Sequence, residues 1–94
     1  MKLSELHSNE SEVAAFPVFS GKGKVAAIQI PADEQLKKHI TKSEAMLLCT
    51  VGEVFYETEK GERKLLMPGE YIIIEPEVEH WVSGIKDSQL VLIK

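Results

Sequence analysis

The sequence predicts an all-β protein, a single antiparallel jelly-roll or β-barrel domain, and two observations support this prediction. The chain has 94 residues, which is the size of one domain. From residue 24 onward it consists of short apolar or β-branched runs separated by turns rich in Gly, Pro, Asp and Lys. Many short strands at such even spacing are typical of sandwiches and barrels. After residue 16 no segment shows a convincing 3.6-residue hydrophobic period, so long helices are not expected.

The N-terminal part is predicted to differ from the rest of the chain. Residues 1–16 are polar and acidic, and we expect a tail with one short helical turn around 10–15 and an exposed His7. Residues 17–94 are expected to form the barrel domain. Its predicted strands are KVAAIQI (24–30), LKKHI (36–40), AMLLCTV (45–51), VFYET (54–58), RKLLM (63–67), YIIIE (71–75), HWVS (80–83) and QLVLI (89–93).

Several of these strands are apolar at every position, as in AMLLC, YIII and LVLI. A strand with one face in water would alternate apolar and polar residues. These strands are therefore expected to be covered on both faces, and a chain of 94 residues has little material for a second layer. We expect a homodimer, since a closed two-fold pair would also remove exposed sheet edges.

Composition and charge exclude several classes of partner. The net charge is −4 and the isoelectric point is about 5.3, so no basic surface is expected for nucleic acid or for an anionic membrane. No apolar run approaches the ~20 residues of a membrane helix, and the N-terminus lacks the apolar core of a signal peptide. Cys49 is the single cysteine, which points to a reducing compartment. We expect a cytoplasmic protein.

Two histidines lie at positions where a known motif has histidine. The family pattern is G-x5-H-x-H-x3-4-E-x6-G followed by G-x5-P-x-G-x2-H-x3-N. Without gaps, the first part falls on Asp33, His39, Thr41, Ala45 and Gly52, and the second on Gly69, Glu75, Glu77, His80 and Gly84. Over residues 24–94 the chain thus resembles the cupin superfamily, in particular its small single-domain cupin 2 type. This resemblance implies a jelly-roll barrel that pairs into dimers.

The resemblance also implies a metal motif that is degenerate in this chain. Metal-binding cupins use two histidines and a glutamate from the first part and one histidine from the second. Here His39 and His80 hold two of those positions, while Thr41 and Ala45 replace the other two. Glu44 is a candidate third ligand, but it lies one residue from the expected place, and such an offset turns a strand side chain to the opposite face. The metal would be zinc, nickel, iron or manganese.

These observations leave three functions open. The first is a barrel that binds an unknown small molecule in a pocket lined by His39, Thr41, Ala45, Leu47, Cys49 and His80, with its metal centre degenerate or absent. The second is a metal-dependent cupin enzyme of the dioxygenase, isomerase or decarboxylase type that uses His39 and His80. The third is a non-catalytic dimeric interaction module. Cys49 shares a strand face with Ala45 and Leu47, which places it in this pocket. A small buried apolar residue without a role in binding would occupy the same position.

Overall fold

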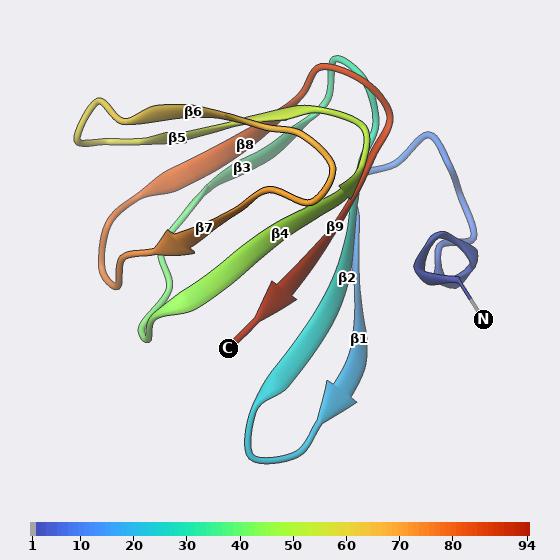
Figure 1. Cartoon of the computed structure of the whole chain (residues 1–94), viewed down its shortest axis with the longest axis horizontal. Coiled ribbons are helices and arrows are strands. Elements are labelled where there is room, and N and C mark those ends of the chain that lie inside the picture. Colours follow the sequence, from blue (N-terminus) through green and yellow to red (C-terminus); the bar gives the residue numbers. More distant parts are fainter. Residues whose placement is uncertain (1) are drawn as a thin grey trace.

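A computed structural model describes residues 2–94 as two facing antiparallel sheets preceded by a short 3-10 helix (Figure 1). The elements over this range are η1 (Leu3–Leu6), β1 (Ala14–Ser20), β2 (Lys24–Ile30), β3 (Gln35–His39), β4 (Ala45–Val51), β5 (Val54–Thr58), β6 (Arg63–Leu66), β7 (Tyr71–Ile74), β8 (His80–Gly84) and β9 (Ser88–Ile93). The prediction of an all-β antiparallel jelly roll is confirmed.

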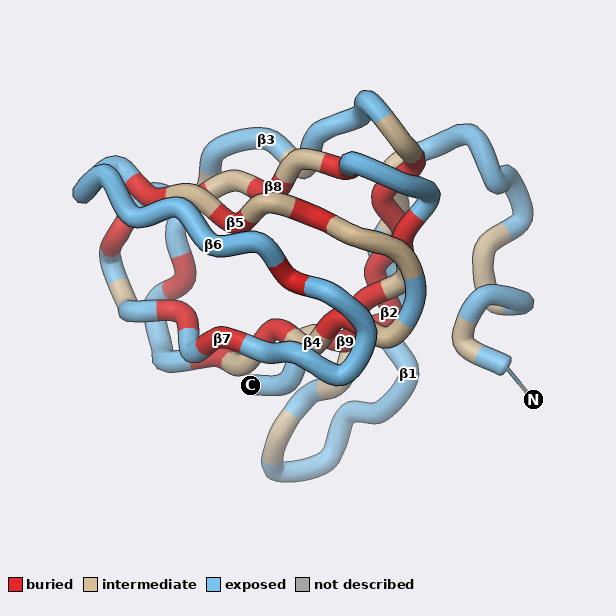
Figure 2. The backbone as a smooth tube through the Cα atoms, turned by 45° about the horizontal axis from the view of Figure 1, so that its top comes forward, coloured by how far each residue is buried: buried red, intermediate tan, exposed pale blue. Residues whose placement is uncertain are grey.

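The strand order defines which strands share a sheet. One sheet has five strands in the order β1-β2-β9-β4-β7, and the other has four in the order β3-β8-β5-β6. The core lies between them, where inward residues of both sheets meet, as the buried segments in Figure 2 show. β6 and β7 are edge strands of different sheets, so one side of the barrel ends in two unpaired edges.

The alternation of side chains explains the strands that were predicted best. β4 and β5 have the predicted limits, and both alternate between buried and partly exposed residues. Period two is what a strand on a packed sheet requires, because successive side chains point to opposite faces.

Within residues 2–94 we find no helix that combines the length and apolarity needed to cross a bilayer.

The N-terminal predictions are partly wrong. The predicted boundary between tail and domain, after residue 16, falls inside β1 (Ala14–Ser20). The helical turn lies at Leu3–Leu6 instead of 10–15, and His7 is half-buried instead of exposed. Two hydrogen bonds explain the ordered tail, because the Nε2 of Gln29 donates to backbone carbonyls of the tail at 2.7 and 2.9 Å.

Two turns of the motif keep a glycine-like backbone without glycine. Asp33 and Glu77 replace motif glycines, and their φ angles are 65° and 64°. Left-handed backbone is unfavourable for residues with a Cβ. Gly52, a retained motif glycine, has a φ of 87°, and a Cβ there would meet the backbone of Asp87 and Ser88. The motif backbone is therefore preserved even where its residues have changed.

Candidate functional site

The two motif histidines lie side by side on the inner face of the four-stranded sheet. His39 ends β3 and His80 begins β8, and the two residues are direct cross-strand partners. Their rings are in edge-to-face contact, with centroids 4.2 Å apart. The ring of Tyr56, on the next strand β5, has its centroid 5.6 Å from that of His80. Neighbouring strands thus bring two imidazoles and a phenol together.

Backbone carbonyls determine the tautomer of both histidines. The Nδ1 of His80 lies 3.1 Å from the carbonyl oxygen of Val78, and the Nδ1 of His39 lies 2.9 Å from that of Lys37. A carbonyl oxygen can only accept a hydrogen bond, so each Nδ1 carries the proton. A ring with its single proton on Nδ1 has an acceptor lone pair at Nε2.

The acceptor of His80 is buried and unpaired. The side chain is 1% exposed, and among residues 2–94 nothing forms a hydrogen bond with its Nε2. Burial lowers the pKa of His80 below its ordinary value, and nearby His39 lowers it further, against the opposing hydrogen bond to Val78. His80 is therefore neutral at neutral pH. An unpaired buried acceptor of this kind costs free energy and suits a donor supplied from outside the chain.

The other predicted pocket residues lie on β4, in the opposite sheet, and in the loop that leads into it. Thr41, in the loop between β3 and β4, is buried, and its Oγ1 has no hydrogen-bond partner in the described chain. Ala45, Leu47 and Cys49 project from β4 into the core cluster. Burial raises the pKa of the Cys49 thiol, and its sulfur lies 3.6 Å from the carbonyl oxygen of Val51. Cys49 thus behaves as a small buried group.

The side chains present do not fit the metal site of the family. Glu44 is exposed, and no group of three or more His, Cys, Asp or Glu residues within the described chain is arranged to hold an ion. Metal sites usually need at least three protein ligands. His39 and His80 supply two imidazoles, and Ala45 has no donor atom at all.

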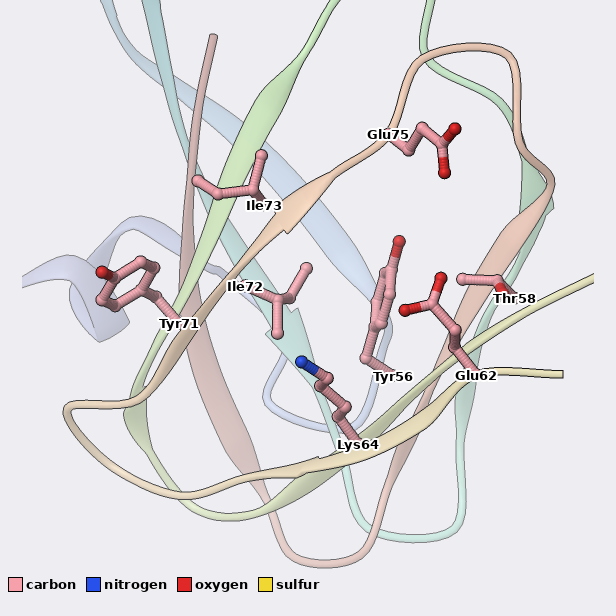
Figure 3. Close-up of a pocket in the computed structure, with 8 residues that line it drawn as sticks. All are labelled: Tyr56, Thr58, Glu62, Lys64, Tyr71, Ile72, Ile73 and Glu75. Carbon is pink, nitrogen blue, oxygen red and sulfur yellow. The ribbon is translucent and has the colours of Figure 1, made fainter. Parts of the chain in front are cut away.

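A pocket of about 450 Å³ opens between the edge strands β6 and β7 (Figure 3). Figure 3 shows Tyr56, Glu62 and Glu75 pointing toward a common space, whereas Tyr71 and Ile73 point away from it. The lining residues are Tyr56, Thr58, Glu62, Lys64, Tyr71, Ile72, Ile73 and Glu75. Tyr56 connects this pocket to the histidines, because it lines the pocket and also lies against His80.

The sequence motifs did not indicate this pocket, although the polar residues on one face of β5 pointed to it. Val54, Tyr56 and Thr58 share one face of β5, and all three are buried. A phenol and a hydroxyl at core positions indicate a polar interior site. Burial raises the pKa of Tyr56, and the carboxylates of Glu62 and Glu75 raise it further. The phenol therefore stays protonated and is able to donate a hydrogen bond.

Comparison with solved structures identifies the architecture. A cupin superfamily protein from Desulfitobacterium hafniense superposes with a TM-score of 0.85 and 13% identity, over 98% of this chain and 84% of that one. This chain has the cupin fold. An RmlC-like cupin with a double-stranded β-helix fold from Methanocaldococcus jannaschii gives a TM-score of 0.79 and 18% identity, over 94% and 84% of the two chains.

The cupin architecture also occurs in a protein whose function is not known. A conserved protein of unknown function from Streptococcus pyogenes gives a TM-score of 0.84 and 13% identity, over 99% of this chain and 82% of that one. No protein-family model matches the sequence, and no curated protein does. The cupin resemblance predicted from the motif is thus confirmed at the level of the fold.

Proposed function

We propose that this small cupin domain binds an uncharged polar small molecule that enters between β6 and β7 and donates a hydrogen bond to His80. The observation that supports this most directly is the buried, unpaired Nε2 of His80. The ring of Tyr56 lies against His80 and also lines a pocket of about 450 Å³. A site of this size suits a small ligand. A hydroxyl or amide N–H of the ligand would satisfy the acceptor that the chain leaves without a partner.

The charged residues that line the pocket account for a preference for uncharged ligands. Glu62 and Glu75 bring two carboxylates to the pocket, and Lys64 brings one cation. Glu75 is also paired with Lys60, whose Nζ lies 3.1 Å from its Oε1 at an exposed position. The space beside Tyr56 is thus unfavourable for an anion, while the protonated phenol and the Thr58 hydroxyl offer neutral hydrogen bonds.

Tyr56 and Tyr71 form a matched pair for testing this proposal. Both line the pocket, but only Tyr56 points into it in Figure 3. We would titrate ¹⁵N-labelled protein with monosaccharides and aromatic alcohols, and with the corresponding carboxylates, and follow the amide signals by NMR. We expect at least one neutral compound to shift signals of Tyr56, Thr58 and His80, and the carboxylates to shift them less.

The variants then locate the binding. Tyr56→Phe removes one hydrogen bond and should weaken the affinity roughly tenfold, whereas Tyr71→Phe should leave it unchanged. The proposal is contradicted if every compound leaves these signals unmoved at millimolar concentration, or if both variants weaken binding equally. Stoichiometric zinc, nickel, iron or manganese in the freshly purified protein would instead favour the metal-dependent enzyme.

A further inference from the structure

The β1–β2 hairpin carries the five-stranded sheet away from the four-stranded sheet (Figures 1 and 2). The inner face of β2 and β9 therefore changes character along its length. The cross-strand pair Ile28 and Leu90 belongs to the core cluster, whereas Ala26 and Leu92, the next pair on the same face, are only partly buried. The inner face thus continues beyond the enclosed core.

A pair of lysines ends this inner face. Lys24 and Lys94 follow Ala26 and Leu92 on the same side of their strands. The backbone N–H of each lysine donates to the carbonyl oxygen of the other at 2.9 Å, so the two residues are direct cross-strand partners. Like charges directly opposite each other destabilise a sheet. A bound anion would remove this repulsion.

Two pockets meet at these lysines. An apolar pocket of about 210 Å³ lies on the hairpin and is lined by Phe19, Ala26 and Leu92, among others. A more polar pocket of about 450 Å³ opens between the hairpin and the loop from β3 to β4. Lys24 and Lys94 line both pockets. We call the two together the hairpin site.

The polar pocket gathers positive charge in a chain whose net charge is −4. Lys22 and Lys42 join Lys24 and Lys94 in its lining, so that three separate segments contribute four ammonium groups. Over the part of the chain that the structure describes, no Asp or Glu side chain lines this pocket, and none of the four lysines forms an ion pair. The pocket therefore favours an anion.

Two hydroxyl groups add hydrogen-bonding capacity to the polar pocket. Thr41 lines it and is 5% exposed, and its Oγ1 has no hydrogen-bond partner in residues 2–94. The backbone of Thr41 is fixed, because its carbonyl oxygen accepts a hydrogen bond from the N–H of Glu77 at 2.8 Å. Ser43 lines the same pocket. Both hydroxyls can donate to an anionic oxygen, and an unpaired buried hydroxyl costs free energy.

We propose that the hairpin site binds a small amphipathic anion, an apolar chain attached to a phosphate group. The phosphate lies among the lysines, which bind phosphate as point charges, and four cations attract a dianion more strongly than a singly charged carboxylate. The apolar chain lies on Phe19, Ala26 and Leu92. No residue is shared with the pocket between β6 and β7, so this inference goes beyond the proposed neutral ligand and is independent of it.

Titration of the full ¹⁵N-labelled chain with octyl phosphate, butyl phosphate and octanol tests both parts of the proposal. Octyl phosphate should shift the amide signals of residues 19–26, 41–43 and 92–94. Each half-buried CH₂ group contributes roughly twofold in affinity, so butyl phosphate should bind at least about tenfold more weakly. Octanol lacks the charge and should also bind these residues at least about tenfold more weakly than octyl phosphate.

Two pairs of matched variants locate the binding. Lys24→Gln should weaken the affinity for octyl phosphate about three- to fivefold, whereas Lys37→Gln, which removes the same charge from an exposed position of β3, should not. Phe19→Ser should weaken it by a similar factor, and Val18→Ser should leave it unchanged. Phe19 and Val18 are 61% and 45% exposed, so these variants are expected to fold, which far-UV circular dichroism would check.

Three results would overturn the proposal. The first is the absence of shifts at the hairpin site with millimolar octyl phosphate, or shifts confined to Tyr56 and His80. The second is an equal loss of affinity in Lys24→Gln and Lys37→Gln. The third is binding to vesicles of anionic phospholipid without binding of monomeric octyl phosphate, which would assign the lysines to a membrane surface.

Discussion

The outer faces of the two sheets both carry apolar side chains, but the four-stranded sheet covers its aromatic rings with charged groups. There Lys38 lies 5.0 Å over the ring of Trp81, and Arg63 lies 3.7 Å over that of Phe55. Glu57 accepts a hydrogen bond from the Trp81 indole at 2.7 Å and pairs with Arg63 at 3.0 Å. Aromatic rings covered in this way are compatible with water.

The inner faces differ in the opposite sense. The four-stranded sheet directs His39, His80, Tyr56 and Thr58 inward, whereas the five-stranded sheet contributes mainly aliphatic groups such as Ile28, Leu47 and Leu90 to the core. The two sheets therefore have different roles. The four-stranded sheet holds the polar groups of the site and faces solvent, and the five-stranded sheet supplies apolar surface on both sides.

The largest effect is expected when a polar group is placed on the aliphatic inner face. Ala45 is 3% exposed on β4, and Ala45→Glu would bury a carboxylate without a partner. We expect a loss of about 3–5 kcal/mol in the free energy of unfolding, or protonation of the new carboxyl group. Thermal melting measures the loss. A variant as stable as the parent would show that this face is not enclosed.

Adding Thr41→His to that variant completes the metal motif of the family. The retained backbone should then present three histidines and one carboxylate to one centre, and added nickel should raise the melting temperature of the double variant by mass action. The parent, with His39 and His80 alone, should gain little from the same addition. An equal gain for both proteins would mean that the four positions do not converge.

A pair of aromatic substitutions distinguishes the roles of the two outer faces. Trp81→Ala removes a half-buried indole and should cost about 2 kcal/mol of stability without changing association. Tyr71→Ala removes a side chain that is 59% exposed in the single chain, so it should change the stability of the monomer little while weakening self-association. Denaturant unfolding at low concentration and sedimentation at high concentration measure the two effects. If Trp81→Ala also weakened association, the two faces would not have separate tasks.

The pH dependence of stability should arise from the four-stranded sheet. The folded protein lowers the pKa of His80, so the unfolded chain binds more protons once the pH falls below the ordinary value of 6.5. The stability associated with neutral His80 is therefore complete above pH 6.5 and is lost as the pH falls from there through the lower, folded pKa. Urea unfolding between pH 7.5 and 5 should show this decline, and His80→Gln should reduce it. A decline that His80→Gln leaves unchanged would assign it to other groups.

The smallest effect concerns the backbone that leads into β8. Glu77 has a φ of 64° and immediately precedes the segment that holds His80. Glu77→Gly relieves left-handed strain of about 1–2 kcal/mol, while glycine makes the unfolded chain more flexible by about 0.4–1 kcal/mol. We expect a net gain of about 0.5 kcal/mol, measured by thermal melting, and Glu79→Gly serves as a control that should not stabilise. A loss at residue 77 would mean that its side chain stabilises the turn.

Local sequence patterns predicted most of the strands, because most strands are short apolar runs that end at turn residues. β4 and β5 have apolar runs that end in turns, and their limits were predicted correctly. β1 was missed because Pro17 interrupts it and because its pairing with β2 is a long-range property of an edge strand. Apolar runs such as AMLLC predicted strands covered on both faces, whereas in the single chain the outer residues of β4 are partly exposed and those of β7 are exposed.

The site was predicted less completely, for a physical reason. Motif spacing indicated His39 and His80, and the structure makes them cross-strand neighbours. Tyr56 has no motif, and its place beside His80 depends on the pairing of β5 with β8, which joins residues far apart in the chain. The unpaired Nε2 of His80 is likewise a property of three-dimensional packing, and no local sequence pattern encodes it.

The most direct test of the proposed site is the tautomer of His80. Long-range ¹H–¹⁵N NMR correlation of the imidazole rings at pH 7.5 distinguishes a protonated nitrogen from one with a lone pair. We predict that His80, like His39, carries its proton on Nδ1, where the Val78 carbonyl accepts it, and that Nε2 has the shift of an unprotonated, unpaired nitrogen. A proton on Nε2, or a doubly protonated ring at this pH, would contradict a buried acceptor that awaits a ligand donor.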